Sequence, residues 1–197
     1  MGELILYLYP EKPRLISIDQ PLFDKLSKDP RWVAEPKYNG NRLVLIMDGD
    51  DVQFWNRHGE KFSYSPDEEL VRSLARFHTK GRCMFDGELR NNKVPGIKHR
   101  IVLWDTFMWD GKLLVDKPYS ERRSFLPWEV ARKNFAPTKQ ATNLHSYKRL
   151  FHEWIKDPEI EGMVIKKSNG MLNLSRTRGQ DSNWIVKVRR PSNSYRF

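Results

Sequence analysis

An Asp-Gly turn between two β-rich runs organises the N-terminal half of this 197-residue chain. Residues 42–47 and 52–55 are dominated by branched and aromatic side chains, and Asp48-Gly49-Asp50-Asp51 separates them. Two such runs joined by an Asp-Gly turn predict a β-hairpin. Lys37 then lies just before a strand, at the mouth of the hairpin.

Helix and strand signals alternate along the rest of the chain. The clearest helix start is Ser65-Pro66-Asp67-Glu68, with an N-cap serine, a proline at the first helical position and a capping-box glutamate. Leu70, Leu74 and Phe77 follow at helical spacing. We expect further strands at residues 4–9, 83–89, 100–108, 161–167 and 185–188, and helices near 120–130 and 146–156.

These signals describe an α+β fold in one domain spanning residues 1–197. The chain has no internal repeat and no linker rich in glycine or serine. Residues 168–183 are the longest stretch without a pattern, and their length favours a functional or a mobile loop.

The chain is basic, with 35 Lys and Arg against 25 Asp and Glu and a formal net charge of +10. This balance suits a protein that meets phosphate polyanions, although a soluble basic surface without such a partner has the same composition. Cys83 is the only cysteine, which excludes an intramolecular disulfide and suits a cytoplasmic protein of a prokaryotic or virus-infected cell. Residues 4–9 are too few for a signal peptide or a membrane span, so no membrane partner is expected.

Candidate chemistry begins at Glu35-Pro36-Lys37-Tyr38-Asn39-Gly40-Asn41-Arg42, which sets a lysine and an arginine around a glycine. Taken alone, a lysine beside a turn is usually just solvated. Asp86 and Glu88 are two residues apart on a predicted strand and share a face. Such a pair suits a metal ion or a ribose, or it is the polar side of an edge strand that meets water.

Two further segments combine charge with a strand. In Glu161-Gly162-Met163-Val164-Ile165-Lys166-Lys167, regular alternation puts Glu161 on the face of Lys167 rather than of Lys166, so Lys167 is the alternative to Lys166. Lys187 and Arg189 lie two apart and share a face.

The order of these segments is more specific than any one of them. Lys-x-x-Gly-x-Arg, Asp-Gly-Glu, an aromatic-Asp strand, Glu-Gly-x-x-x-Lys and Lys-x-Arg follow one another between residues 35 and 190. The set resembles the covalent nucleotidyltransferase superfamily of ATP-dependent DNA ligases, RNA ligases and messenger-RNA capping enzymes. Ile101-Val-Leu-Trp-Asp-Thr-Phe-Met-Trp-Asp-Gly111 and Tyr119-Ser-Glu-Arg-Arg123 look most like DNA ligases. The resemblance implies a nucleotidyltransferase (adenylation) domain of antiparallel sheets flanked by helices, ATP-grasp-like, with its motif core at residues 35–190.

The resemblance implies that Lys37 attacks the α-phosphate of ATP and carries AMP as a phosphoramidate. A lysine can form such an adduct and pass it on, whereas an always-protonated arginine cannot. On the family pattern Glu35 reads the exocyclic amine of adenine, and because a carboxylate repels the carbonyl of guanine, ATP is expected over GTP. Arg42 should hold the ribose or a nucleic-acid phosphate, Glu88 should contact the ribose hydroxyl, and Trp104 should stack on adenine.

The same resemblance implies a metal-assisted reaction on nucleic acid. Glu161 and Glu88 are implied to hold Mg²⁺, with Mn²⁺ as the alternative. The cations expected around the phosphates are Lys166, Lys187 and Arg189. The nucleic-acid contacts are assigned to four arginines, Arg57, Arg176, Arg178 and Arg190, the first of which is also expected near the nucleotide.

The chain departs from the family pattern at two positions. Asn39 stands where the first motif normally has Asp, less often His. If that residue acts by hydrogen bonding, Asn can replace it; if its charge matters, adenylation should be slow or absent. Trp184 lies three residues before Lys187 rather than two, a spacing that a local bulge would absorb.

Three functions remain in competition. The leading one is a monomeric ATP-dependent ligase that seals 5'-phosphate/3'-hydroxyl nicks in duplex DNA during replication or repair. An RNA or mixed RNA–DNA strand ligase shares the motif set. A non-catalytic nucleic-acid-binding remnant of a ligase would keep the basic surface without the chemistry. No oligonucleotide-binding barrel (OB-fold) is expected within residues 1–197, so a separate OB-fold or helper protein is an expected partner.

Overall fold

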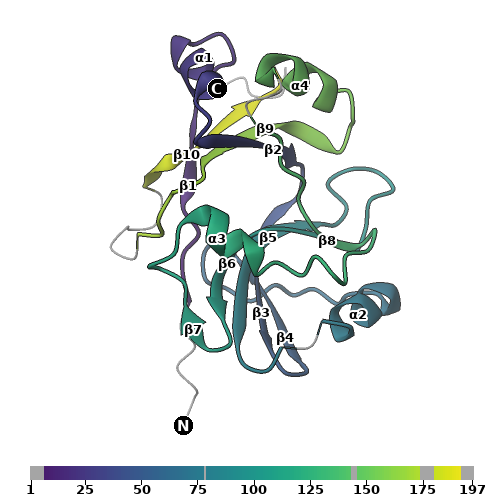
Figure 1. Cartoon of the computed structure of the whole chain (residues 1–197). Helices are drawn as coiled ribbons and strands as arrows, with labels where there is room; N and C mark the ends of the chain where they lie inside the picture. The colour runs from purple at the N-terminus through teal and green to yellow at the C-terminus, as the bar shows by residue number, and fades with distance from the viewer. Residues whose placement is uncertain (1–6, 78, 143–145, 174–179, 192–197) are drawn as a thin grey trace.

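Two β-sheets with helices on their outer faces make up the fold (Figure 1). The computed structural model describes residues 7–77, 79–142, 146–173 and 180–191. In this part of the chain no helix is long and apolar enough to cross a membrane.

The smaller sheet carries the strand of Lys37. Its strand order is β1 (Lys12–Leu15), β10 (Asp181–Arg189), β9 (Ile160–Lys167) and β2 (Trp32–Tyr38). β9 runs antiparallel to both neighbours, and β1 runs parallel to β10. The helices α1 (Pro21–Lys28) and α4 (Tyr147–Trp154) bury their apolar faces against this sheet, with Phe23 and Phe151 almost fully buried.

The larger sheet is built around the predicted hairpin. Its order is β4 (Asp51–Asn56), β3 (Asn41–Asp48), β5 (Cys83–Arg90), β6 (Arg100–Trp109) and β7 (Lys112–Leu113), and β8 (Phe135–Pro137) pairs with β6 in parallel. The remaining helices are α2 (Glu68–Ala75) and α3 (Tyr119–Ser124).

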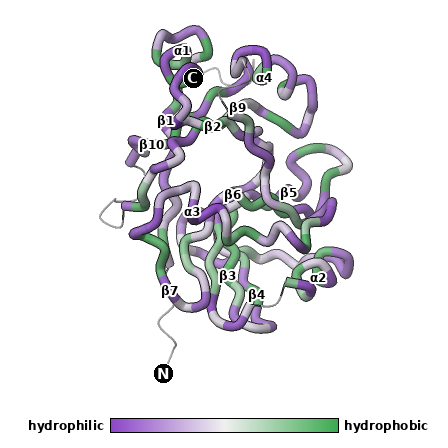
Figure 2. Tube along the Cα trace, viewed as in Figure 1, coloured by the Kyte–Doolittle hydropathy of each residue, from purple (hydrophilic) through white to green (hydrophobic). Residues whose placement is uncertain are grey.

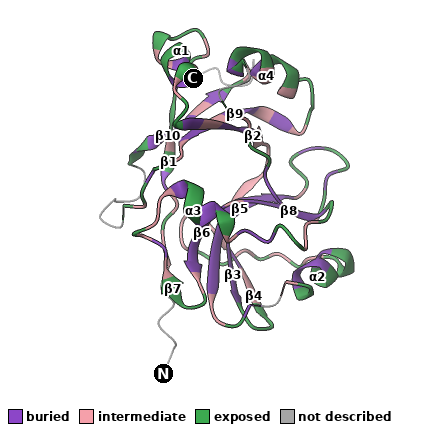
Figure 3. Ribbon diagram, viewed as in Figure 1, coloured by how far each residue is buried: buried purple, intermediate pink, exposed green. Residues whose placement is uncertain are grey.

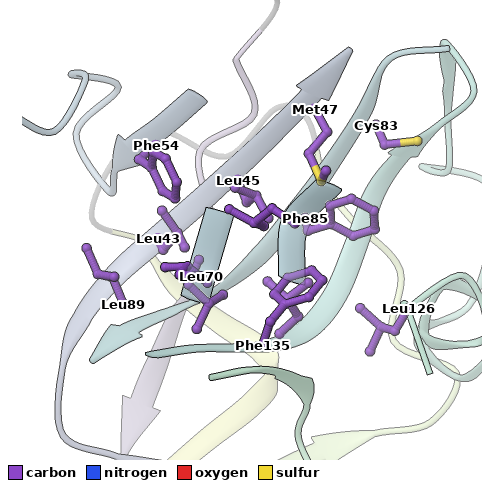
Figure 4. Close-up of a cluster of buried hydrophobic side chains, with 13 residues drawn as sticks. Leu43, Leu45, Met47, Phe54, Leu70, Cys83, Phe85, Leu89, Leu126 and Phe135 are labelled. Atoms are coloured by element: carbon purple, nitrogen blue, oxygen red, sulfur yellow. The ribbon is translucent and has the colours of Figure 1, made fainter. Parts of the chain in front are cut away.

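The core of the larger sheet lies between its strands and α2. Leu43, Leu45, Phe85 and Phe135 are fully buried there and pack on Leu70 of α2 (Figure 4). Hydrophobic residues concentrate along these strands (Figure 2), and every residue of β5 is buried, whereas the outer faces of the helices are exposed (Figure 3). The carboxylates on β5 are therefore held by a rigid strand and cannot belong to a solvated edge.

The local signals predicted most of these elements. The hairpin is confirmed, with Asp48 paired to Asp51 and Gly49 at a positive φ of 57°. The strands expected at 83–89, 100–108, 161–167 and 185–188 correspond to β5, β6, β9 and β10. The helix near 146–156 is α4, whose N-cap Ser146 accepts a hydrogen bond from the backbone of Arg149.

Three element predictions were wrong in their limits. The N-cap of α2 is Asp67, whose side chain accepts from the amide of Leu70, so the proline precedes the cap. The helix expected over 120–130 ends at Ser124, because Pro127 disfavours helical geometry in the residue before it. Residues 181–183 of the expected loop already belong to β10.

The N-terminal region also differs from expectation. Of the strand expected at residues 4–9, residues 7–9 have no strand geometry and the others lie outside the described residues. The sequence patterns missed β1, α1, β2, β7 and β8. Lys37, expected just before the hairpin strand, lies within β2, which ends shortly before that strand, β3, begins.

Candidate active site

A small cavity between the two sheets brings the candidate residues together. β2 and β9 of the smaller sheet face β3, β5 and β6 of the larger one across it. Its charged or aromatic lining comes from residues far apart in sequence, namely Glu35, Lys37, Tyr38, Arg42, Asp86, Glu88, Trp104, Asp105 and Lys166. Asp86 and Glu88 both line it, as their spacing on one strand predicted.

Lys37 lies near the end of β2, opposite a β-bulge in β9. Lys37 pairs with Gly162 and Tyr38 with Ile160, so Glu161 is the extra residue. The Lys37 Nζ contacts Glu161 Oε1, and the Nε of Arg189 lies 3.8 Å from the same oxygen. The bulge thus turns a carboxylate towards the candidate nucleophile.

The bulge also corrects the strand-parity expectation. With one extra residue at Glu161, the side chains of Glu161 and Lys166 reach the same face of β2 although they are five positions apart, since Glu161 contacts Lys37 and Lys166 contacts Glu35. Lys166 is 3% exposed and its Nζ lies 2.8 Å from Glu35 Oε2. Lys166, and not Lys167, is the cation of this strand that lines the cavity.

Glu35 is buried and held by four donors. Its Oε1 accepts from Tyr119, from Arg123 at 3.2 Å and from Gln140 at 2.8 Å, while Oε2 faces Lys166. Burial alone would raise the pKa of Glu35, but Lys166 and Arg123 outweigh burial and hold the pKa below its ordinary value. Glu35 is therefore an ionised acceptor in a fixed orientation.

Arg42 and Trp104 meet at Asp86. The Nε and Nη2 groups of the Arg42 guanidinium donate to the two oxygens of the Asp86 carboxylate, and the indole Nε1 of Trp104 donates to Asp86 Oδ2 at 2.7 Å. The Arg42 guanidinium lies 5.0 Å from the centre of the Trp104 ring, and Lys166 Nζ lies 5.4 Å from it. The aromatic face expected to receive adenine thus has two cations beside it.

Glu88 is a buried carboxyl of the site with a strongly raised pKa. Burial raises its pKa to about 7. The positive charges of Lys37 and Arg42 act in the opposite direction and lower the pKa, whereas the negative charge of Glu161 raises it further. The two carboxylates implied as metal ligands are therefore close enough to repel each other. Such a pair is stabilised by a divalent cation.

Cations of β10 border the same site. Burial and the neighbouring charges of Arg189 and Lys37 lower the pKa of Lys187 to about 8. The backbone amide of Arg190 donates to Glu161 O at 2.9 Å. Mutual repulsion among these groups would be relieved by a bound anion such as a phosphate chain.

Not every expected residue joins the cavity. Arg57 is exposed on the turn after β4 and does not line it. Arg176 and Arg178 lie outside the described residues. Trp184 is buried and its Nε1 donates to Glu11. The pairing of β10 with β1 shifts register between Asp181 and Val186, and this irregularity accommodates the unusual spacing before Lys187.

Sequence reasoning missed the residues that support Glu35. Tyr119 and Arg123 come from α3 and Gln140 from the segment after β8. Arg122, fully buried, forms a two-pronged ion pair with Asp105 at 2.8 and 2.9 Å. In the sequence, the run Tyr119-Ser-Glu-Arg-Arg123 indicates only a family likeness. Its two adjacent arginines, which follow a tyrosine by three residues, were the available signal for an internal charge network.

Among the described residues, no three His, Cys, Asp or Glu side chains gather closely enough to hold a metal by themselves. Glu88 and Glu161 nevertheless suit a magnesium ion whose other ligands would be phosphate oxygens and water, because Mg²⁺ usually takes only one or two carboxylates from a protein.

Curated DNA ligases are similar to this chain in sequence, at low identity. DNA ligase C1 of Mycolicibacterium smegmatis is 25% identical over 71% of this chain and 47% of its own length. A DNA ligase of Methanocaldococcus jannaschii is 25% identical over 83% of this chain and 36% of its own length. The chain thus spans about half or less of the length of these relatives.

Solved structures share the fold. Mycobacterial DNA ligase D complexed with ATP superposes with a TM-score of 0.69 at 19% identity, over 92% of this chain and 60% of that one. The ATP-dependent DNA ligase of bacteriophage T7 gives 0.56 at 16% identity, over 92% and 68%. The model of the ATP-dependent DNA ligase domain matches residues 17–91 and 89–187, which is most of the chain. With these matches and the antiparallel α+β architecture, the chain belongs to the ATP-dependent DNA ligase domain family.

Proposed function

We propose that this chain is the nucleotidyltransferase core of an ATP-dependent polynucleotide ligase, in which Lys37 forms the lysyl-AMP intermediate. The contact of the Lys37 amine with Glu161, at a cavity that Lys37 and Glu88 line, carries the proposal. A lysine without neighbours at a turn would not be buried among functional carboxylates and cations.

The proposed reaction begins with attack of the neutral Lys37 amine on the α-phosphorus of ATP. A phosphorus–nitrogen bond forms, the bond to the β-phosphate oxygen breaks, pyrophosphate leaves, and the amine loses a proton. Glu161, the carboxylate in contact with that amine, accepts this proton. A nucleic-acid 5'-phosphate oxygen then displaces lysine from AMP, and a 3'-hydroxyl finally displaces AMP from the capped end.

Each step concentrates negative charge at phosphorus. Lys166, Lys187 and Arg189 are the candidate cations that stabilise it. Glu88 and Glu161 would hold the magnesium ion, or manganese in its place, which when bound spreads the same charge.

The base would be read at Glu35. Each carboxylate oxygen has two lone-pair positions; three donors converge on Oε1, whereas Lys166 lies at Oε2. An adenine amine would therefore either bind at the second position of Oε2 or replace a donor at Oε1, where Gln140, an exposed residue, is the one most easily displaced. Stacking of adenine on Trp104 would likewise require the guanidinium of Arg42 to yield part of the ring face.

Intact mass after incubation with magnesium and ATP or GTP tests the first step. We expect an AMP adduct that is lost in Lys37→Ala and retained in Lys25→Ala, an exposed lysine of α1. Preferential attachment of GMP would contradict the adenine assignment, and no adduct would favour a non-catalytic nucleic-acid-binding remnant. Asn39→Asp tests the family departure: faster adduct formation would assign the role to charge, and an unchanged rate to hydrogen bonding.

The polynucleotide substrate is proposed to be a nicked DNA duplex, with RNA-containing duplexes as the alternative. The relatives named above are DNA ligases, which favours DNA. Sealing assays on nicked DNA, nicked RNA and hybrid duplexes separate the two, since RNA strands impose A-form geometry and add 2'-hydroxyls. Preferential sealing of the RNA nick would overturn the DNA assignment.

A further inference from the structure

The connection between β5 and β6 is a basic loop at the edge of the active site. Between Glu88 and Asp105 the chain has four Lys or Arg residues, Arg90, Lys93, Lys98 and Arg100, and no Asp or Glu. Figure 1 shows the connection as a loop that projects from the sheet, and Lys93 and Lys98 are exposed (Figure 3). None of the motif residues lies in it.

The loop is held in one shape. Val94 and Ile97 are each 8% exposed and anchor its underside. The amide of Asn92 donates to Ile97 O at 3.0 Å, closing the tip. The ring of His99 stacks on Tyr64 at 5.7 Å. Because the backbone is already ordered, binding through its lysines loses little conformational entropy.

The base of the loop is joined to the turn that follows Lys37. Arg90 and Arg100 both pair with the side chain of Glu159, whose backbone oxygen accepts from the amide of Asn39 at 3.1 Å. The guanidinium of Arg90 lies 4.8 Å above the ring of Tyr38. The loop is therefore fixed beside the nucleophile, on the side where β2 passes into β3.

In the described part of the chain, carboxylates close to the loop are already engaged with other groups. Glu159 is committed to the two arginines at the base, and Asp67, the N-cap of α2, accepts a hydrogen bond from the amide of Leu70. Lys93 and Lys98 thus present positive charge to solvent on a loop whose base is tied to the turn after Lys37.

We propose that Lys93 and Lys98 bind backbone phosphates of the nucleic-acid duplex whose 5'-end is presented to Lys37. The choice of nucleic acid as the partner rests on the proposed function. The location of the binding surface and its positive charge come from the structure of the loop. Lysine contacts to phosphate add affinity without reading sequence, so the loop sets the location of the duplex and not its sequence.

The test compares Lys93→Glu/Lys98→Glu with Lys25→Glu/Lys28→Glu, which makes the same charge change on exposed lysines of α1. Binding to a 5'-phosphorylated nicked DNA duplex is measured without ATP over a range of salt concentrations. Affinity falls with salt, and each lost phosphate contact makes the slope of log affinity against log salt shallower by about 0.9. We expect a loss of about 1 to 2 in the loop variant and little change in the α1 variant.

An unchanged slope in the loop variant, or an equal loss in both variants, would overturn the proposal. Formation of the AMP adduct from ATP alone should be unchanged by the loop substitutions. If wild-type protein formed no adduct while the loop variant still lost salt-dependent binding, the proposed function would fail and the binding surface would stand. Lys93→Gln/Lys98→Gln, which removes the same two phosphate contacts and is expected to lose a similar slope, replaces the reversal if that variant does not fold.

Discussion

Replacing Glu88 with glutamine should change how the stability of the protein depends on pH. Burial raises the pKa of this carboxyl to about 7, whereas an exposed glutamate has a value of 4.5. One pKa unit corresponds to about 1.4 kcal/mol, so ionising Glu88 costs about 3 kcal/mol more in the folded chain than in the unfolded one.

The sign follows from the proton balance. Between about pH 4.5 and pH 7 the folded chain holds this proton more tightly than the unfolded chain, so the free energy of unfolding falls as pH rises and levels off above pH 7. Glu88→Gln removes that contribution. Relative to wild type, the variant should gain about 3 kcal/mol between about pH 4.5 and pH 8.

Urea denaturation of both proteins over this range, in nucleotide-free buffer with a chelator, measures the difference. The chelator is needed because a bound cation would favour the ionised form of Glu88. A constant offset between the two proteins across the range would refute the assignment of the raised pKa to Glu88.

Two further predictions concern buried or crowded cations. Arg122→Met leaves Asp105 buried without its cation and should lower the free energy of unfolding, measured in urea, by about 3 to 5 kcal/mol. The double variant Asp105→Asn/Arg122→Met should recover part of this loss. A loss below about 1 kcal/mol in Arg122→Met would contradict the pairing. The pKa of about 8 at Lys187 should make its amine react faster with an acylating reagent near pH 8 than most lysines, as followed by peptide mass spectrometry. Arg189→Ala removes a neighbouring positive charge and should raise that pKa and slow the labelling, so an unaltered rate would argue against charge crowding.

Local signals were sufficient for the elements whose geometry is decided by near neighbours. The hairpin follows from an Asp-Gly turn that accepts a positive φ at Gly49. The cap of α4 follows from a serine that bonds to a nearby amide. Elements with weak local patterns, such as β2 and β8, form because they pair with distant strands, and no short window of sequence contains that partner.

The sequence by itself determined the family resemblance and the identity of the candidate nucleophile, because the order and spacing of motif residues are linear properties of the chain. Only the tertiary structure decided which side chains share the site. The bulge at Glu161 turns that carboxylate to Lys37 and selects Lys166 over its neighbour, since one extra residue in a strand reverses which face its side chains occupy. The donors around Glu35 were likewise set by packing, because Arg123 and Gln140 reach it only after α3 and β8 dock beside β2, at sequence separations of 88 and 105 residues.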